Sequence, residues 1–182
     1  MAANKGMFFV LANELNVLIE KVFLSCELQC SQIKPEEESA EYDATGFKLN
    51  TLNVQYRRAK ITPTKVGQFV TLWKRDAPKQ PIRPYQDKDL IDLAIIAARK
   101  DEQLGYFIFP LSVLCEQGIV SNDKHPGKRG FRVYPVWDEP MSKQAKKTQE
   151  WQLPFFLELS QVQDLEASQL QSYFQLGSVD TL

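Results

Sequence analysis

Gln68-Phe69-Val70-Thr71-Leu72-Trp73-Lys74-Arg75 is the stretch of this sequence that decides the fold class. Its side chains alternate with the period of a β-strand: Phe69, Thr71 and Trp73 fall on one face, and Val70 and Leu72 on the other. Because both faces are apolar, the pattern predicts a central strand that is covered on two sides. We therefore expect Val70 and Trp73 to be buried on opposite faces of one sheet.

The segments around this strand predict helices at both ends of the chain and about five strands between them. Further strands are expected at Gly46–Leu49, Asn53–Ile61, Asp92–Ala98, Tyr106–Phe109 and Gly130–Val136. Helices are expected at Phe8–Leu28, after Pro110, from Ser142 to Trp151 and at Asp164–Leu176. The first helix should stop by Pro35, and Glu36-Glu37-Glu38 reads as an exposed loop. This order predicts one mixed α/β domain over residues 1–182.

Composition narrows the classes of function. The chain of 182 residues has a net charge of −1, which argues against attachment to nucleic acid or membrane by bulk charge. The three cysteines, Cys26, Cys30 and Cys115, are too few and too uneven for a disulfide framework. Cys26 and Cys30 are expected to share one face of the first helix. With His125 as the single histidine, we expect no zinc site and no cofactor.

The sequence shows no targeting or membrane segment. The apolar run from Met7 to Ala12 is too short to span a bilayer. Only Lys5 precedes it, which makes a poor signal peptide. The expected location is the cytoplasm.

Charge is distributed unevenly along the chain. No acidic residue lies between Ala44 and Arg75, and a second basic cluster lies around Arg129. Basic grooves follow phosphates and aromatic rings stack on bases, so the two segments together predict a face for nucleic acid or another anion. The alternative is that the aromatic residues are core and the charges are solvated. The candidate binding residues are Arg57, Lys60, Thr62, Thr64, Lys65, Lys74, Arg75, Lys128, Arg129, Arg132 and Tyr134.

The segment from Lys60 to Gly67 adds hydroxyl groups to this basic stretch. Thr62 and Thr64 flank Pro63, and hydroxyl and ammonium groups around such a turn can hold an anion. The segment lacks the Gly-x-x-x-x-Gly-Lys spacing of a P-loop, so it does not predict ATP-type phosphate binding.

Catalytic residues are harder to assign. Asp89 and Asp92, with Asp87, could bind Mg²⁺ in a metal-dependent nuclease, or they could belong to a solvated loop and a strand entrance. The sequence therefore identifies no catalytic residue.

Four segments resemble the MepB family. They are Ala59–Arg75, Gly105–Pro110, Lys128–Asp138 and Gln144–Gln152, and the resemblance extends from about Met7 to Phe156. It implies a bacterial protein with a three-layer α/β/α fold of the restriction-endonuclease-like class. That class often binds or cuts nucleic acid, although fold alone does not establish function.

The catalytic pattern of active members of that class is an acid on one strand, followed by Asp/Glu-x-Lys on the next. Here Leu72 stands two positions before Lys74, where the carboxylate is expected, and Leu111 follows the Phe-Pro step. We therefore expect a non-catalytic binding module for nucleic acid or another anion. One alternative is a Mg²⁺-dependent nuclease that uses Asp92, Asp89 and Lys74. Another is the binding of a protein or small-metabolite partner through Arg129 and Arg132.

Overall fold

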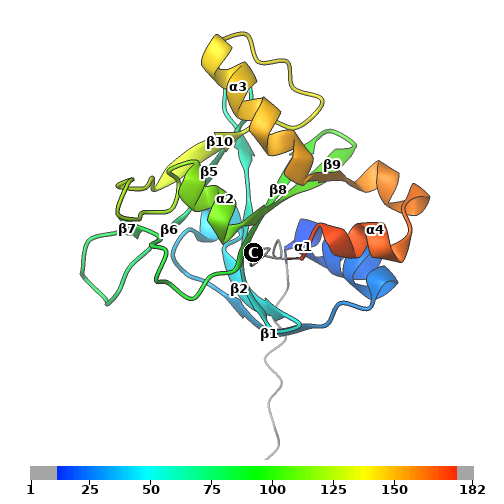
Figure 1. Cartoon of the computed structure of the whole chain (residues 1–182), viewed down its shortest axis with the longest axis horizontal. Coiled ribbons are helices and arrows are strands. Elements are labelled where there is room, and N and C mark those ends of the chain that lie inside the picture. The colour runs from blue at the N-terminus through cyan, green and yellow to red at the C-terminus, as the bar shows by residue number, and fades with distance from the viewer. Residues whose placement is uncertain (1–11, 176–182) are drawn as a thin grey trace, which may run out of the picture.

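A six-stranded mixed sheet forms the centre of the protein (Figure 1). The computed structural model describes residues 12–175. The strand order is β1-β2-β3-β8-β9-β11. The bounds are β1 Cys30–Pro35, β2 Thr45–Leu49, β3 Leu52–Arg58, β8 Leu93–Lys100, β9 Gln103–Pro110 and β11 Phe156–Glu158. Strands β3 and β8 are parallel, and the other neighbouring pairs are antiparallel.

Strand β8 is the most deeply buried of the set, as its unbroken apolar sequence predicts. Residues 93–98 are all buried. Leu93 and Ile95 face one core, and Ala94 and Ile96 face the other, because successive side chains of a strand point to opposite sides. The expected strand at Asp92–Ala98 is confirmed.

Helical segments cover one face of the sheet. They are α1 Asn13–Leu18, η1 Ile19–Phe23, η2 Leu24–Cys26, η5 Leu159–Asp164 and α4 Ala167–Ser172, and Figure 1 shows α1 and α4 together on this side. Leu15, Leu18 and Val22 are fully buried there, as the 3.6-residue period predicts. The expected Phe8–Leu11 part of the first helix and Leu176 of the last lie outside the described residues.

The first helical region ends earlier than the sequence pattern predicts. It stops at Cys26, because Glu27 takes a left-handed conformation with φ of 57°. Cys30 then opens β1, so the prediction that Cys26 and Cys30 share one helix face is wrong. No side chain of β1 is fully buried, and such an edge strand carries little apolar signal in its sequence.

Two smaller sheets and two helices cover the other face. One sheet has the order β10-β5-β4, and the other pairs β6 with β7. The bounds are β4 Lys60–Ile61, β5 Gln68–Thr71, β6 Trp73–Lys74, β7 Arg83–Pro84, β10 Gly130–Val133, α2 Leu111–Glu116 and α3 Lys143–Gln152. Short 3-10 turns lie at η3 Ala40–Tyr42 and η4 Leu153–Phe155. The second core lies between this layer and the main sheet.

The prediction of one central strand at 68–75 is therefore corrected. The segment is two strands, β5 and β6, and β5 is central in the small three-stranded sheet, not in the main one. Val70 is buried as expected, but Trp73 is only half-buried. Both faces of β5 are apolar because Val70 faces the second core while Phe69 packs against Tyr42 on the other side, with ring centroids 6.3 Å apart.

Several element ends follow local sequence signals. Gly118, with φ of 65°, follows the end of α2. The hydroxyl of Ser142 accepts a hydrogen bond from the Ala145 N–H, and so caps α3 as expected. Over residues 12–175, no helix combines the length and the apolar character needed to cross a membrane.

Candidate functional site

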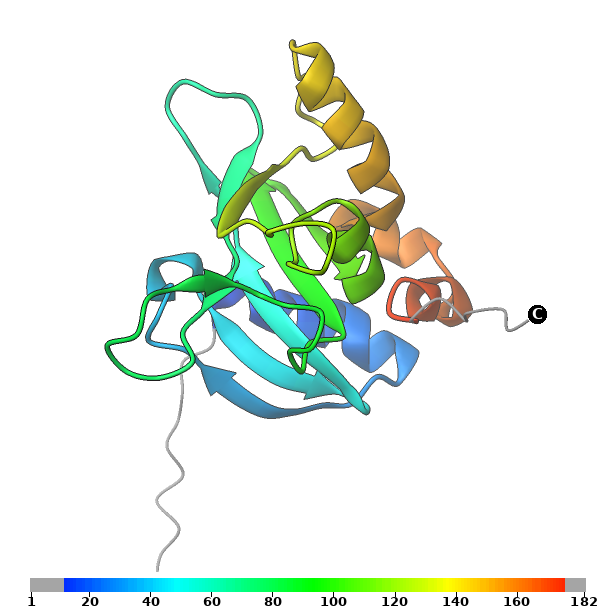
Figure 2. The ribbon, with the colours of Figure 1, turned by 60° about the vertical axis from the view of Figure 1, so that its left-hand side comes forward.

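The pairing of β5 with β10 brings the two basic segments together. The strands run antiparallel, with Thr71 opposite Gly130 and Gln68 opposite Val133. The loop before β5, residues 62–67, therefore lies beside the chain that leaves β10. Figure 2 shows this loop and helix α3 projecting at the same end of the molecule.

Arg132 fixes this loop to β10. Its Nη2 donates a hydrogen bond to Thr62 Oγ1 at 2.6 Å, and its Nη1 donates to the Gly67 carbonyl oxygen at 3.1 Å. Gly67 has φ of 79°, and a Cβ there would lie 2.6 Å from the ring of Tyr134. The loop can approach this closely only because position 67 is glycine.

A basic groove lies between this loop, β10 and α3. It has a volume of about 430 Å³, and its walls hold three cations, Lys65, Lys128 and Arg132, and no acidic residue. The other lining residues are Gln117, Ile119, Gly130, Phe131, Tyr134, Ser142, Gln144, Ala145, Thr148, Trp151 and Gln152. In the described part of the chain, none of the three cations forms an ion pair. The groove is therefore a site of uncompensated positive charge.

Helix α3 forms the second wall and is held by Gln152. This side chain is fully buried. Its Oε1 accepts a hydrogen bond from the Tyr134 N–H at 2.8 Å, and its Nε2 donates to the Arg132 carbonyl oxygen at 2.9 Å. The N-terminal turn of α3 borders the groove at Ser142, Gln144 and Ala145. A helix N-terminus adds partial positive charge to that of the three cations.

Aromatic side chains form part of the groove walls. Trp151 is half-buried, with its ring centroid 5.4 Å from that of Phe109. Tyr134 is only 9% exposed, because its ring covers Gly67. Tyr134 therefore shapes the wall, and Trp151 offers the more accessible ring. The sequence pattern singled out Tyr134 as a binding residue but did not identify Gln152, because hydrogen bonds to the backbone of residues 18 and 20 positions away cannot be read from local sequence.

The remaining predicted residues do not all reach this groove. Thr64 lines a neighbouring pocket on the loop, and Arg129 is exposed just before β10. The Lys60 ammonium lies 4.6 Å from the centre of the Tyr42 ring, a cation–π contact.

Arg57, Lys74 and Arg75 lie toward the other end of β5, and each is paired with an acid. Arg57 contacts Glu36 at 3.2 Å, Lys74 contacts Asp89 at 3.1 Å, and Arg75 contacts Glu38 at 2.7 Å. These ion pairs neutralise much of the charge that the acid-free stretch of sequence suggested. The structure thus separates the predicted basic face into two regions.

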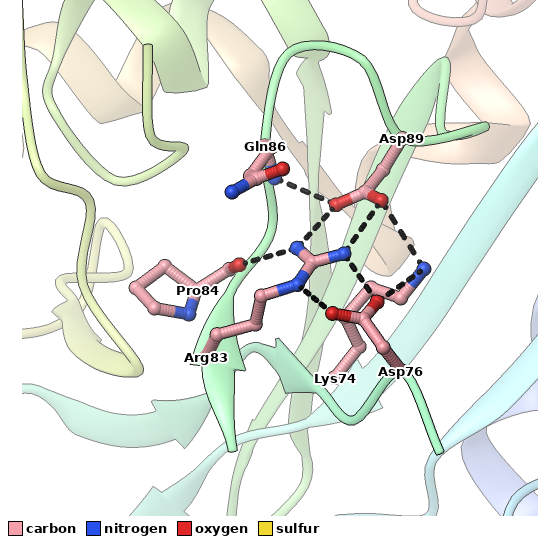
Figure 3. A network of polar contacts seen from close by, with 6 residues as sticks. All are labelled: Lys74, Asp76, Arg83, Pro84, Gln86 and Asp89. Atoms are coloured by element: carbon pink, nitrogen blue, oxygen red, sulfur yellow. Dashed lines mark hydrogen bonds and ion pairs between the residues drawn. The ribbon is translucent and has the colours of Figure 1, made fainter. Parts of the chain in front are cut away.

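An ion-pair network occupies the space beside Lys74 (Figure 3). The guanidinium of Arg83 lies between two carboxylates: it contacts Asp76 at 2.6 Å and Asp89 at 2.8 Å. Burial raises the pKa of Asp89, but hydrogen bonds from Arg83, the Gln86 N–H and Lys74 outweigh it and lower the pKa to about 2. The hydrogen bonds from Arg83 also lower the pKa of Asp76.

The acids of the nuclease alternative are not gathered into one site. Arg83 lies between Asp76 and Asp89 and donates hydrogen bonds to both carboxylates. Asp92 is bonded to a different residue: its Oδ2 accepts hydrogen bonds from the backbone and side-chain amides of Asn53 at 2.7 and 3.1 Å. Within residues 12–175, no cluster of three His, Cys, Asp or Glu side chains is suited to a metal ion.

Comparisons with known proteins agree with the sequence resemblance. The MepB-like family matches residues 36–158. The crystal structure of MepB superposes with a TM-score of 0.69 and is 34% identical, over 81% of this chain and 97% of that chain. A bacterial homing endonuclease overlaps 78% of this chain and 87% of its own, at 15% identity and a TM-score of 0.43, too low to establish a shared fold. No curated protein matches the chain.

Proposed function

The chain belongs to the MepB-like family, and we propose that it is a non-catalytic binding module whose basic groove holds the phosphates of a nucleic acid strand. The observation that carries the proposal is the set of three cations, Lys65, Lys128 and Arg132, in a groove without an acidic residue. Phosphate oxygens are the anions that such a groove can contact repeatedly along its length.

The free energy of binding would come mainly from counterion release. Each cation that contacts a phosphate frees a condensed counterion, so affinity falls as salt rises. Because Lys65, Lys128 and Arg132 form no ion pair within residues 12–175, none of this free energy is spent on separating such a pair. Trp151 would add stacking with a base that enters the groove.

Two other functions have weaker support. The restriction-endonuclease-like class that the sequence suggests would favour a Mg²⁺-dependent nuclease using Asp89, Asp92 and Lys74. Arg83 bonded to Asp89, and Asp92 bonded to Asn53, argue against that arrangement. Against a protein or metabolite partner held by both Arg129 and Arg132, Arg132 lines the groove but Arg129 does not.

Fluorescence anisotropy with labelled DNA and RNA oligonucleotides tests the proposal. With about three phosphates neutralised, the log–log salt slope should be about −2 for a single strand and about −3 for a duplex. Lys65→Ala and Lys128→Ala should each weaken binding to all sequences and flatten the slope by about one unit. Lys21→Ala is the matched control, because Lys21 is exposed on η1, on the other side of the main sheet.

The proposal fails if low-salt titrations up to about 100 µM protein detect no binding, because nonspecific binding of this kind falls within that range. It also fails if Lys21→Ala weakens binding as much as Lys128→Ala, because net charge and not the groove would then be responsible.

A further inference from the structure

A second cleft lies at the other end of β5. Its volume is about 740 Å³, within the range of small-molecule sites. It is lined by Lys34, Pro35, Glu36, Glu37, Glu38, Gln55, Trp73, Lys74, Arg75, Tyr85, Lys88, Asp89 and Leu90. It shares no lining residue with the basic groove. The cleft and the basic groove are therefore separate sites.

Arg57 is buried behind this cleft, where it contacts two of the lining residues, Gln55 and Glu36. Val54 and Tyr56 of β3 point into the first core, so Arg57 and Gln55 point to the opposite face of the sheet, toward the cleft. Arg57 is 1% exposed. Its Nη1 donates hydrogen bonds to Gln55 Oε1 at 3.2 Å and to the Tyr56 carbonyl oxygen at 2.8 Å. A buried guanidinium on a central strand is costly unless its charge is paired, so its partners matter.

Only one of the two N–H donors on the side of this guanidinium that can bind an oxyanion has a hydrogen-bond partner in residues 12–175. The Nε–H and Nη2–H of an arginine point in parallel and match the two oxygens of a carboxylate or phosphate. In Arg57, Nη2 donates to Glu36 Oε2 at 3.2 Å, while Nε is buried and has no hydrogen-bond partner among residues 12–175. The Tyr85 hydroxyl lies beside the same guanidinium. A buried donor without an acceptor is rare and favours an additional acceptor.

The position of Glu36 allows its carboxylate to move away from Arg57. Its side chain is 30% exposed, against 1% for Arg57. Its backbone N–H donates to the Ala44 carbonyl oxygen at 2.8 Å, so its main chain is fixed while its carboxylate reaches Arg57 from the rim. The carboxylate can swing into solvent without any change in the main sheet.

We propose that this cleft is a second binding site, for a small molecule that carries a carboxylate or phosphate group, and that Glu36 takes the place of that group on Arg57 in the free protein. The oxyanion of the ligand would bond to both Nε and Nη2 of Arg57. The rings of Trp73 and Tyr85 would face the body of the ligand. Lys34 and Lys88, which are exposed and form no ion pair in residues 12–175, would attract it to the rim.

Isothermal titration with inorganic phosphate, at constant ionic strength, tests the site in three variants of the full chain. Glu36→Ala removes the internal competitor. If Glu36 occupies Arg57 about nine-tenths of the time, this change should tighten phosphate binding about tenfold. Glu41→Ala is the matched control, since it removes the same charge from an exposed residue that does not line the cleft, and it should leave the affinity unchanged. Adding Arg57→Lys to Glu36→Ala should abolish the gain in phosphate affinity, because lysine lacks the two parallel N–H donors of arginine.

Amide NMR spectra locate the bound phosphate without depending on whether the Arg57 variant folds. Phosphate should shift the side-chain amide of Gln55 and the indole N–H of Trp73 in Glu36→Ala. The same titration with acetate shows whether the Arg57 guanidinium prefers a carboxylate or a phosphate. Adding Lys65→Ala to Glu36→Ala should leave the phosphate affinity unchanged, which separates this site from the basic groove.

Equal affinities in Glu36→Ala and Glu41→Ala would overturn the proposal. So would a Glu36→Ala protein that shows only a lower melting temperature and no shift at Gln55, since Glu36 would then be a structural partner of Arg57.

Discussion

Arg132 on β10 holds Thr62 in the loop before β5 through a 2.6 Å hydrogen bond between residues 70 positions apart in sequence. The same arginine is one of the three cations of the groove. Arg132 therefore supplies charge and also fixes the position of Lys65, which follows Thr62 in the loop. Variants at the two ends of this bond should separate these contributions.

Arg132→Ala should weaken nucleic acid binding and flatten its salt slope by about one unit, because one phosphate contact is lost. Thr62→Val keeps every charge but removes the hydroxyl that anchors the loop. It should weaken binding by about three- to tenfold, the range expected for one lost hydrogen bond, and leave the slope unchanged. Anisotropy titrations at several salt concentrations measure both quantities. Identical slopes for wild type and Arg132→Ala would show that Arg132 makes no phosphate contact.

Gly67→Ala should destabilise the protein by about 3 kcal/mol, from the left-handed backbone at this position and from the close approach of its Cβ to Tyr134. Gly46→Ala is the comparison. Gly46 has no positive φ, and the nearest contact of its Cβ is the flexible Gln55 Nε2 at 3.2 Å, so the cost should stay below about 1 kcal/mol. Urea unfolding followed by circular dichroism gives both values. Equal losses would mean that the Gly67–Tyr134 contact is not tightly packed.

Gln152→Leu should cost about 3 kcal/mol of stability. It leaves the Tyr134 N–H and the Arg132 carbonyl without their present partner in a buried place. Gln144→Leu, on an exposed position of the same helix, should cost little. Hydrogen exchange should also show faster exchange of α3 amides in Gln152→Leu. Unchanged exchange there would mean that α3 is held mainly by other contacts.

Asp89→Asn should change the response of the protein to acid. The folded-state pKa of Asp89 is lowered from 3.8 to about 2, so its ionised form stabilises the fold above the unfolded-state pKa. This contribution, about 2 kcal/mol, is lost as the pH falls from about 4 to about 2. Asp89→Asn should therefore be less stable at pH 7 and lose less stability across that interval.

Chemical denaturation at a series of pH values measures this effect. Asp87→Asn is the control, because Asp87 is exposed and forms no ion pair in the described residues. A constant stability difference between wild type and Asp89→Asn from pH 7 to pH 2 would contradict the role given to Arg83 and Lys74.

The sequence predicts the helices and strands whose pattern is contained in a few neighbouring residues. The unbroken apolar run of β8 and the serine at the start of α3 each identify their element. Apolar alternation in β5 identifies a strand, but it cannot say which sheet that strand joins, because any apolar layer satisfies it. The edge strand β1 was missed because Cys30, Ile33 and Pro35 are only half-buried and its other residues are exposed.

The same limit applies to the candidate site. The basic segments were visible as sequence, and β5–β10 pairing places Lys65, Lys128 and Arg132 in one groove. The pairing of Arg57 and Arg75 with acids was not visible, since Glu36 and Glu38 are 21 and 37 residues away. Composition records how many charges a segment carries, and only the fold decides which of them are already compensated.

The connection between the parallel strands β3 and β8 has a consequence for synthesis on the ribosome. Residues 59–92 carry β4–β7 where a helix is usual, and β5 gains its second neighbour only when β10, Gly130–Val133, has emerged. Until then, β5 presents an unpaired edge with apolar side chains. A chain that is released before residue 130 keeps that edge open, and such edges template pairing between copies. Truncated products ending between β9 and β10 should therefore aggregate, even though five of the six strands of the main sheet are already present.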